Sequence, residues 1–305
     1  MLRERTTEGR DGAATTATEG FVMLTSLRRR AASALAVGSA ALLLGAAGAS
    51  PASARPPQVD LVNLGDSFSA AIGTGAITAS PDDPACLQGQ GPDHVSKLDS
   101  HPRITLLLDA ACSGLDSAGV GAVAALPPVA AALAEAELVT LTLGGNDVPW
   151  IPTILACSTF GDDQSCDGAL GLAALAVAAA AASAGTTVDA IDAATDAKIV
   201  VLGYPHLVDP SAAGLPITPE RAADLNAVTD QLNAALQAST EANGATFVDV
   251  TARFAGHGVG SDDPWIHLDL ADLFDPNNLH PTSEGYLSGY HPAVMSAISI
   301  GQLGR

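Results

Sequence analysis

The chain has 305 residues, of which 48% are hydrophobic, and its 33 acidic and 13 basic side chains give a net charge of −20. So acidic a surface repels phosphate backbones and anionic lipid headgroups, which argues against nucleic acid as a partner. Solubility outside the cell is enough to account for the charge.

The first 54 residues differ in pattern from the rest of the chain. Three arginines at 28–30 precede an almost uncharged run at 31–50, and small residues occupy the positions at 52–54 that a signal peptidase reads. This order predicts an N-terminal extension and secretory signal peptide, residues 1–54, with cleavage after Ala54. A cleaved signal is favoured over a membrane anchor because the run is mostly alanine and glycine. Translation from Met23 is left open.

Residues 55–305 have the size of one α/β domain. The N-terminal part holds six of the 13 basic and four of the 33 acidic residues, so residues 55–305 carry 7 and 29, a net charge of −22. All four cysteines lie here, and an even number in an exported protein favours disulfides over metal ligation. Of three possible pairings we predict Cys86 with Cys112 and Cys157 with Cys166, because each pair brackets one loop region.

Short apolar runs alternate with stretches of helical character. Strands are expected at 59–64, 104–108, 138–143, 199–202 and 246–250, several of them apolar nearly throughout, as in a parallel sheet. Helices are expected from residue 69 onward and at 113–135, 168–194, 219–242 and 282–300, the fourth with Thr218 as N-cap and Pro219 at its first position. The alternation predicts a three-layer α/β/α sandwich with a five-stranded parallel sheet.

Three other stretches bear on the organisation of the domain. The alanine-rich residues 168–182 lie between two predicted strands, so we expect them to cover the sheet rather than to cross a membrane. Residues 73–91 and 256–278 are rich in Gly, Pro and Asp and too long for ordinary connections, which makes them candidate site loops.

Polar residues stand where predicted strands end, at the sheet edge where such folds bind ligands. Ser67 follows the first strand and is a candidate nucleophile, while the N–H of Gly114 and the amide of Asn146 follow the second and third strands and could donate to an oxyanion. His280 precedes the last predicted helix and is a candidate base. Alone, each is an ordinary cap or turn residue. Their combination in this order favours catalysis.

The sequences Gly65-Asp66-Ser67, Gly114, Gly144-Gly145-Asn146-Asp147 and His280-Pro281 resemble the four blocks of the SGNH (GDSL) hydrolase superfamily. The resemblance implies a flavodoxin-like fold, with Ser67 as nucleophile, His280 as general base, and Gly114 and Asn146 as oxyanion donors. No metal or organic cofactor is expected, and zinc is disfavoured because no Cys-x-x-Cys or His-x-x-His spacing occurs. The absence of a Gly-x-Ser-x-Gly sequence argues against an α/β-hydrolase.

The predicted signal, the paired cysteines and the sequences Gly256-His257 and Pro264-Trp265-Ile266 resemble the secreted actinobacterial esterase/lipase branch in particular. Members of that branch usually have a further cysteine after Gly-His. This chain has Gly258-Val259-Gly260-Ser261 there, so a third disulfide is missing.

The group that orients His280 is left open. Much of the superfamily has an aspartate three residues before the histidine, where this chain has Asn277, and the nearest acid is Asp275. The esterase/lipase branch includes members that use a backbone carbonyl. We therefore predict a Ser–His dyad supported by the main chain near Asn277, with Asp275 as a third triad member as the alternative. Asp66 and Asp147 are expected to be structural anchors.

The expected function is hydrolysis of small-molecule or lipid carboxylic esters by an extracellular monomer without stable membrane insertion. A carbohydrate O-deacetylase is an alternative, ranked lower because exposed aromatic platforms are expected in such an enzyme and the chain has only 11 aromatic residues. A non-catalytic cell-wall or ligand-binding module is disfavoured because Ser67, Asn146 and His280 are all present. The lack of an obvious apolar lid suggests short acyl chains.

Overall fold

The computed structural model describes residues 58–81, 84–211 and 214–303, so the predicted signal peptide lies outside the described residues. A parallel sheet in the order β4-β1-β5-β6-β7 forms the centre of the domain. Its strands are β1 (Val59–Gly65), β4 (Ile104–Asp109), β5 (Leu138–Thr142), β6 (Lys198–Leu202) and β7 (Thr246–Val248). The predicted five-stranded parallel sheet is confirmed, and every strand lies within two residues of its expected bounds.

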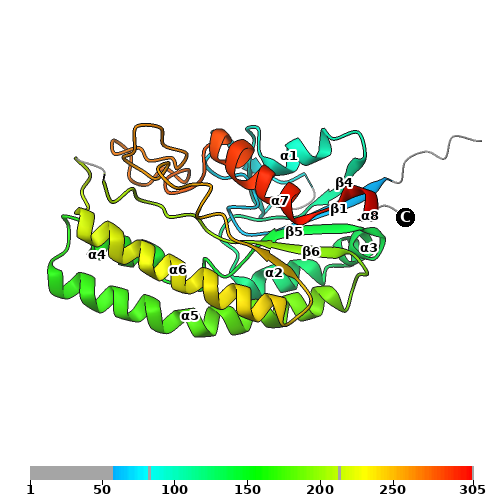
Figure 1. Cartoon of the computed structure of the whole chain (residues 1–305), viewed down its shortest axis with the longest axis horizontal. Helices are drawn as coiled ribbons and strands as arrows, with labels where there is room; N and C mark the ends of the chain where they lie inside the picture. The colour runs from blue at the N-terminus through cyan, green and yellow to red at the C-terminus, as the bar shows by residue number, and fades with distance from the viewer. Residues whose placement is uncertain (1–57, 82–83, 212–213, 304–305) are drawn as a thin grey trace, which may run out of the picture. The chain divides into compact units, whose positions relative to one another are not determined.

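Helices cover both faces of the sheet and complete the three layers (Figure 1). The lower layer in that view consists of α2 (Ser117–Ala124), α3 (Pro127–Glu135), α5 (Asp163–Asp192) and α6 (Pro219–Glu241). The upper layer consists of α1 (His94–Asp99), the π-helix η1 (Gly285–Tyr290) and α7 (His291–Ala297). Two further short helices are α4 (Trp150–Ala156) and α8 (Ile300–Leu303).

The strands divide their apolar side chains between the two faces, as alternation along a strand requires. In β1, Val59 and Leu61 belong to the core beneath α7, whereas Val62 and Leu64 belong to the core against α5. All five residues of β5, at the centre of the sheet, are buried. Burial on both faces explains why these strands read as nearly continuous apolar runs.

Two of the helix predictions are wrong. The residues from 69 onward form turns rather than a helix, because Ala71 has a left-handed backbone (φ 58°) that a helix cannot accommodate. The chain continues into a hairpin of β2 (Ile77–Ala79) and β3 (Leu87–Gly89). The stretch 113–135 is two helices bent by 80°, because Pro127 has no N–H to continue the first and holds the residue before it extended.

The last predicted helix begins later and is irregular. It starts as the π-helix η1, continues as α7 and ends where Ile298 becomes extended. The short helices α1 and α4 were not anticipated, whereas α6 begins with Thr218 as N-cap and Pro219 at its first position, as predicted.

By length and composition alone, α5 could span a membrane. It begins at Asp163 because Asp162 caps it, accepting a hydrogen bond from the N–H of Ser165 at 2.7 Å. Its inward residues, among them Ala173, Val177 and Ala180, pack into the core shared with the sheet. The prediction that this alanine-rich stretch covers the sheet is confirmed.

Both predicted disulfides are present. Cys86–Cys112 joins the residue just before β3 to the segment after β4, and Cys157–Cys166 closes the loop between α4 and α5. Residues 256–278, predicted to be a site loop, have no helix or strand and are called the irregular segment below. This segment is tied to the domain by isolated bridges, Val259 to Val208 and Ile266 to Pro281.

Candidate active site

Ser67 and His280 meet at the carboxyl edge of the sheet. His280 Nε2 lies 2.8 Å from Ser67 Oγ, and Nδ1 lies 2.9 Å from the carbonyl oxygen of Asn278. Because a carbonyl oxygen only accepts, Nδ1 carries the ring proton and Nε2 accepts from the Ser67 hydroxyl. This is the arrangement in which a histidine can activate a serine as nucleophile.

The side chains of Asp275 and Asn277 lie near the histidine but bind other groups. Asn277 Oδ1 accepts from the N–H of Gly73 at 3.0 Å, and its Nδ2 donates to Asp275 Oδ1 at 2.9 Å. Asp275 Oδ2 lies 3.3 Å from His267 Nε2. The geometry therefore places the main chain, not the carboxylate of Asp275, against the His280 ring. The carbonyl belongs to the residue after Asn277.

Two backbone features bring the histidine to the serine. Leu279 has a left-handed backbone (φ 65°), and this tight turn directs the carbonyl of Asn278 back to the ring of His280. Gly73 also has a positive φ (98°), and a Cβ there would lie 2.3 Å from the carbonyl oxygen of Pro281. Only glycine allows the turn after Ser67 to approach the histidine segment so closely.

Three hydrogen-bond donors adjoin the nucleophile. Gly114 and Asn146 line the same pocket as Ser67 and His280. The N–H groups of Ser67 and Gly114 meet no acceptor within the described part of the chain, and Gly114 has a positive φ (85°). Asn146 Nδ2 donates to the carbonyl of Leu115 at 2.8 Å, which fixes the amide and leaves its second hydrogen for a ligand. Such donors can stabilise an oxyanion.

A buried polar network lies beneath the nucleophile. Asp66 Oδ1 accepts from the N–H of Phe68 at 3.0 Å and from Thr142 Oγ1 at 2.6 Å, and Asp66 Oδ2 accepts from the Tyr204 hydroxyl. Tyr204 Oη in turn accepts from the N–H of Gly145 at 2.9 Å. Burial raises the pKa of Asp66, whereas its hydrogen bonds act in the opposite direction. The network joins the turn after β1 to the turn after β5.

Tyr204 was not anticipated, although it follows β6 at the same sheet edge, and the argument from strand ends could have found it. Asp147, in contrast, has an anchoring position of the expected kind. Its Oδ2 accepts from both the N–H and the hydroxyl of Ser117 at 2.8 Å, at the start of α2.

Burial lowers the pKa of His280 from 6.5 to about 4, because the surrounding protein disfavours the imidazolium. The carbonyls of Asn278 and Asn277 oppose this shift of the pKa, and the electrostatic interaction with His267 adds to it. The ring of Phe68 packs against the imidazole with 5.2 Å between centroids. At neutral pH the imidazole is therefore uncharged, the state a general base requires.

The catalytic pocket, of about 260 Å³, is lined by apolar side chains beyond the dyad, including Phe68, Trp150 and Leu207. It adjoins an apolar groove of about 210 Å³, which lies between α4, residues 215–217 and the irregular segment. Pocket and groove share four residues, Ile151, Ile154, Asn278 and Leu279. The groove offers space beyond the catalytic pocket for a longer acyl chain than the sequence suggests.

Among residues 58–81, 84–211 and 214–303, no group of three or more His, Cys, Asp or Glu side chains is placed to hold a metal ion.

The chain matches the GDSL-like Lipase/Acylhydrolase family over residues 64–287. A lipase of Streptomyces rimosus is 33% identical over 279 residues, which cover 90% of this chain and 100% of that protein. Lipase 1 of Streptomyces coelicolor is 30% identical over 272 residues, which cover 87% of this chain and 96% of that protein.

Solved structures agree with this result. The crystal structure of an extracellular lipase from Streptomyces rimosus superposes with a TM-score of 0.69 at 29% identity, covering 79% of this chain and 100% of that one. Phospholipase A1 from Streptomyces albidoflavus reaches the same TM-score at 24% identity, which shows a likeness of fold.

Proposed function

This chain belongs to the GDSL-like Lipase/Acylhydrolase family and is a carboxylic ester hydrolase, and we propose that it works through an acyl-enzyme on Ser67 with His280 as general base. The observation that carries the proposal is the pair of bonds at His280. Nε2 accepts from the Ser67 hydroxyl, while the carbonyl of Asn278 holds Nδ1–H.

In the first half of the reaction, His280 Nε2 takes the proton of Ser67 Oγ as that oxygen attacks the ester carbonyl carbon. The resulting oxyanion accepts hydrogen bonds from the N–H groups of Ser67 and Gly114 and from Asn146 Nδ2. His280 then gives its proton to the departing alkoxide. Water repeats the sequence on the acyl-enzyme, and the proton returns to Ser67. The Asn278 carbonyl keeps the ring oriented throughout.

The substrates proposed are lipid esters whose acyl chains extend beyond the catalytic pocket. The groove that continues from this pocket is almost entirely apolar, so it suits an acyl chain and offers little to a sugar. This lining favours lipid esters over acetylated carbohydrates. The relatives named above are lipases.

We further propose that residues 1–54 are removed on export and that residues 55–305 act outside the cell. Two disulfides within the domain are typical of an oxidising compartment. One similar structure is that of an extracellular lipase. N-terminal sequencing of the protein recovered from the medium of a secreting host should begin at Arg55.

The test of the mechanism is hydrolysis of p-nitrophenyl acetate, butyrate and palmitate by the full chain expressed in such a host, beside Ser67→Ala. We expect kcat to fall about 1000-fold or more in Ser67→Ala, since the nucleophile is lost. Ser100→Ala, which alters an exposed serine bonded only to the Lys97 carbonyl, should keep its activity. Equal activity of Ser67→Ala and the parent would remove Ser67 as nucleophile.

A further inference from the structure

Six large apolar side chains surround the apolar groove and remain exposed to solvent. This apolar rim consists of Ile151, Leu155, Phe160, Leu270, Leu273 and Phe274. Phe274 is 95% exposed and Phe160 71%. In the described part of the chain only eleven large apolar side chains are exposed, so more than half of them gather at one groove. A cluster of this kind marks a binding surface rather than chance exposure.

Two parts of the chain supply the rim, and local bonds hold both in place. Phe160 lies in the loop that the Cys157–Cys166 disulfide closes, at the end of α4. Phe274 lies in the irregular segment, where its N–H donates to Asp272 Oδ1 at 3.0 Å. Figure 1 shows α4 and this segment, drawn in orange, at the same end of the domain. The rim is thus a formed surface that no described part of the chain covers.

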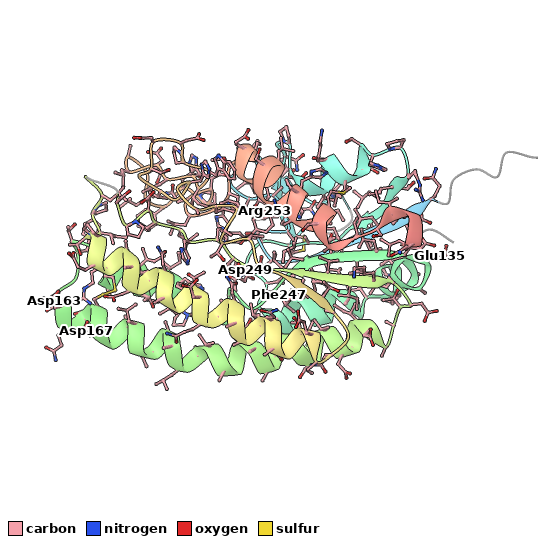
Figure 2. The ribbon with its side chains drawn as sticks, in the orientation of Figure 1. Glu135, Asp163, Asp167, Phe247, Asp249 and Arg253 are labelled. Carbon is pink, nitrogen blue, oxygen red and sulfur yellow. A yellow bond between two sulfur atoms is a disulfide. The ribbon has the colours of Figure 1, made fainter. Side chains whose placement is uncertain are left out.

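The charges around the rim restrict what can bind there. Residues 150–168 and 256–280 contain no lysine or arginine. The nearby Arg221 is already bonded to Asp163 at 3.0 Å, to Asp167 at 2.8 Å and to Asp224 at 3.2 Å. Figure 2 shows Asp163 and Asp167 together at the beginning of α5. No free cation is therefore available on these segments to attract an anionic lipid surface.

Aspartates also alternate with the rim residues along the chain, at positions 162, 163, 269, 272 and 275. A second copy docked through the same face would bring these carboxylates against their equivalents, and like charges so placed disfavour association. A neutral or zwitterionic lipid surface meets neither difficulty, because it accepts apolar side chains without needing a cation.

Building on the ester-hydrolase function proposed above, we infer that the apolar rim docks the enzyme on neutral or zwitterionic lipid aggregates. The groove inside the rim shares Ile151, Ile154 and Leu279 with the catalytic pocket. An acyl chain drawn from the lipid surface therefore reaches Ser67 along a continuous apolar path, without crossing water.

The test measures binding separately from turnover, with the inactive Ser67→Ala protein cosedimented with phosphatidylcholine vesicles. Adding Phe160→Ser and Phe274→Ser should lower the vesicle partition coefficient about tenfold or more, because two apolar anchors are lost. Leu172→Ser with Leu175→Ser is the matched control. These side chains on α5 are 65% and 78% exposed but do not line the groove, so binding should not change.

In the active enzyme, Phe160→Ser with Phe274→Ser should affect the turnover of soluble p-nitrophenyl acetate far less than that of emulsified palmitate ester, since neither side chain lines the catalytic pocket. Hydrolysis of emulsified palmitate ester should fall in parallel with vesicle binding. Unchanged vesicle binding by the Phe variant, or an equal loss in the leucine control, would overturn the inference. So would stronger binding to phosphatidylglycerol vesicles, or a dimer that the Phe substitutions dissociate.

The two proposals fail in different ways. If the parent enzyme did not hydrolyse soluble esters, the proposed function would be refuted even with vesicle binding intact. If turnover of soluble esters depended on Ser67 but binding did not depend on Phe160 and Phe274, only the docking surface would be refuted.

Discussion

His280 faces a neutral partner, the carbonyl of Asn278, where many serine hydrolases place a carboxylate. A carboxylate stabilises the imidazolium by its full charge, whereas a carbonyl offers only a dipole. Burial lowers the pKa of His280, and no carboxylate among the described residues contacts the ring to raise it again. The result is the low pKa of about 4 at the catalytic base.

This pKa predicts how activity depends on pH. A lowered pKa means that the imidazole stays neutral, and so competent as a base, at every pH above about 4. We expect kcat/KM for a soluble ester to be level from about pH 5 to neutrality and to fall about tenfold per unit once His280 is protonated. Samples returned from acid to pH 7 should recover full activity, and circular dichroism recorded at the acidic pH should show that the fold is intact. A midpoint near the ordinary histidine value would contradict the prediction.

At the scale of the secondary-structure elements, the site depends on how the turns after β1, β5 and β6 are joined. Tyr204 makes the connection, because its hydroxyl donates to Asp66 beside the nucleophile and accepts from Gly145 beside Asn146. All three turns lie at the carboxyl edge of the sheet. The distance between nucleophile and oxyanion donor is therefore set in part by a single buried phenol.

Tyr204→Phe should lower both stability and kcat. It leaves a buried carboxylate and a buried N–H each without one partner, at a cost of about 1–3 kcal/mol in the free energy of unfolding. We expect kcat to fall about tenfold with KM little changed, because the two turns lose their alignment. Denaturant unfolding and steady-state kinetics measure the two effects.

Tyr290→Phe is the control for this substitution. Its hydroxyl is also buried and donates at 2.9 Å to the carbonyl of Gly203, and it makes no hydrogen bond to Asp66 or Gly145. It should lose stability and keep kcat. Equal losses of kcat in the two variants would show that Tyr204 acts only through stability.

The elements also show what a sequence can and cannot predict. The strands were found because burial on both faces leaves a continuous apolar signature, as in β5. The turn after Ser67 resembles a helix start in sequence because Asp and Ser are also good helix caps, and nothing in the sequence marks the left-handed backbone of Ala71. The break between α2 and α3 was missed although Pro127 and Pro128 stand there.

Some residues of the candidate site could also be predicted from the sequence, and others could not. Ser67, Gly114, Asn146 and His280 could be placed together because strand ends share one edge of a parallel sheet and the four blocks resemble a known family. The sequence predicts an orienting carbonyl near Asn277 but does not identify it as that of Asn278. The left-handed turn at Leu279, which directs this carbonyl to the ring, has no glycine to mark it. The groove could not be predicted, since α4 and the irregular segment meet only through tertiary packing.

At the scale of the whole domain, charge is the dominant surface property. Residues 55–305 carry 29 acidic and 7 basic side chains, a net charge of −22. Such an excess keeps a protein soluble but destabilises its compact state by self-repulsion. The exposed carboxylates of the rim region belong to this excess.

Screening should therefore stabilise the enzyme. Raising NaCl from about 0.05 M to about 0.5 M shortens the range of charge repulsion to a few ångströms, and we expect Tm to rise by a few degrees. Differential scanning calorimetry of the purified enzyme measures this. An unchanged or lower Tm would show that ion pairs such as those of Arg221 outweigh the repulsion.

The carbonyl that orients His280 also affects how the enzyme tolerates genetic change. A carboxylate in this role can be lost through one codon, whereas a main-chain carbonyl is present whatever amino acid occupies position 278. The orientation of His280 therefore tolerates a change of side chain at position 278 but depends on the backbone turn at Leu279. The side chains of Asp275 and Asn277 do not contact the imidazole, and they hold the surrounding chain instead: Asn277 binds Asp275 and the N–H of Gly73, and Asp275 lies beside His267.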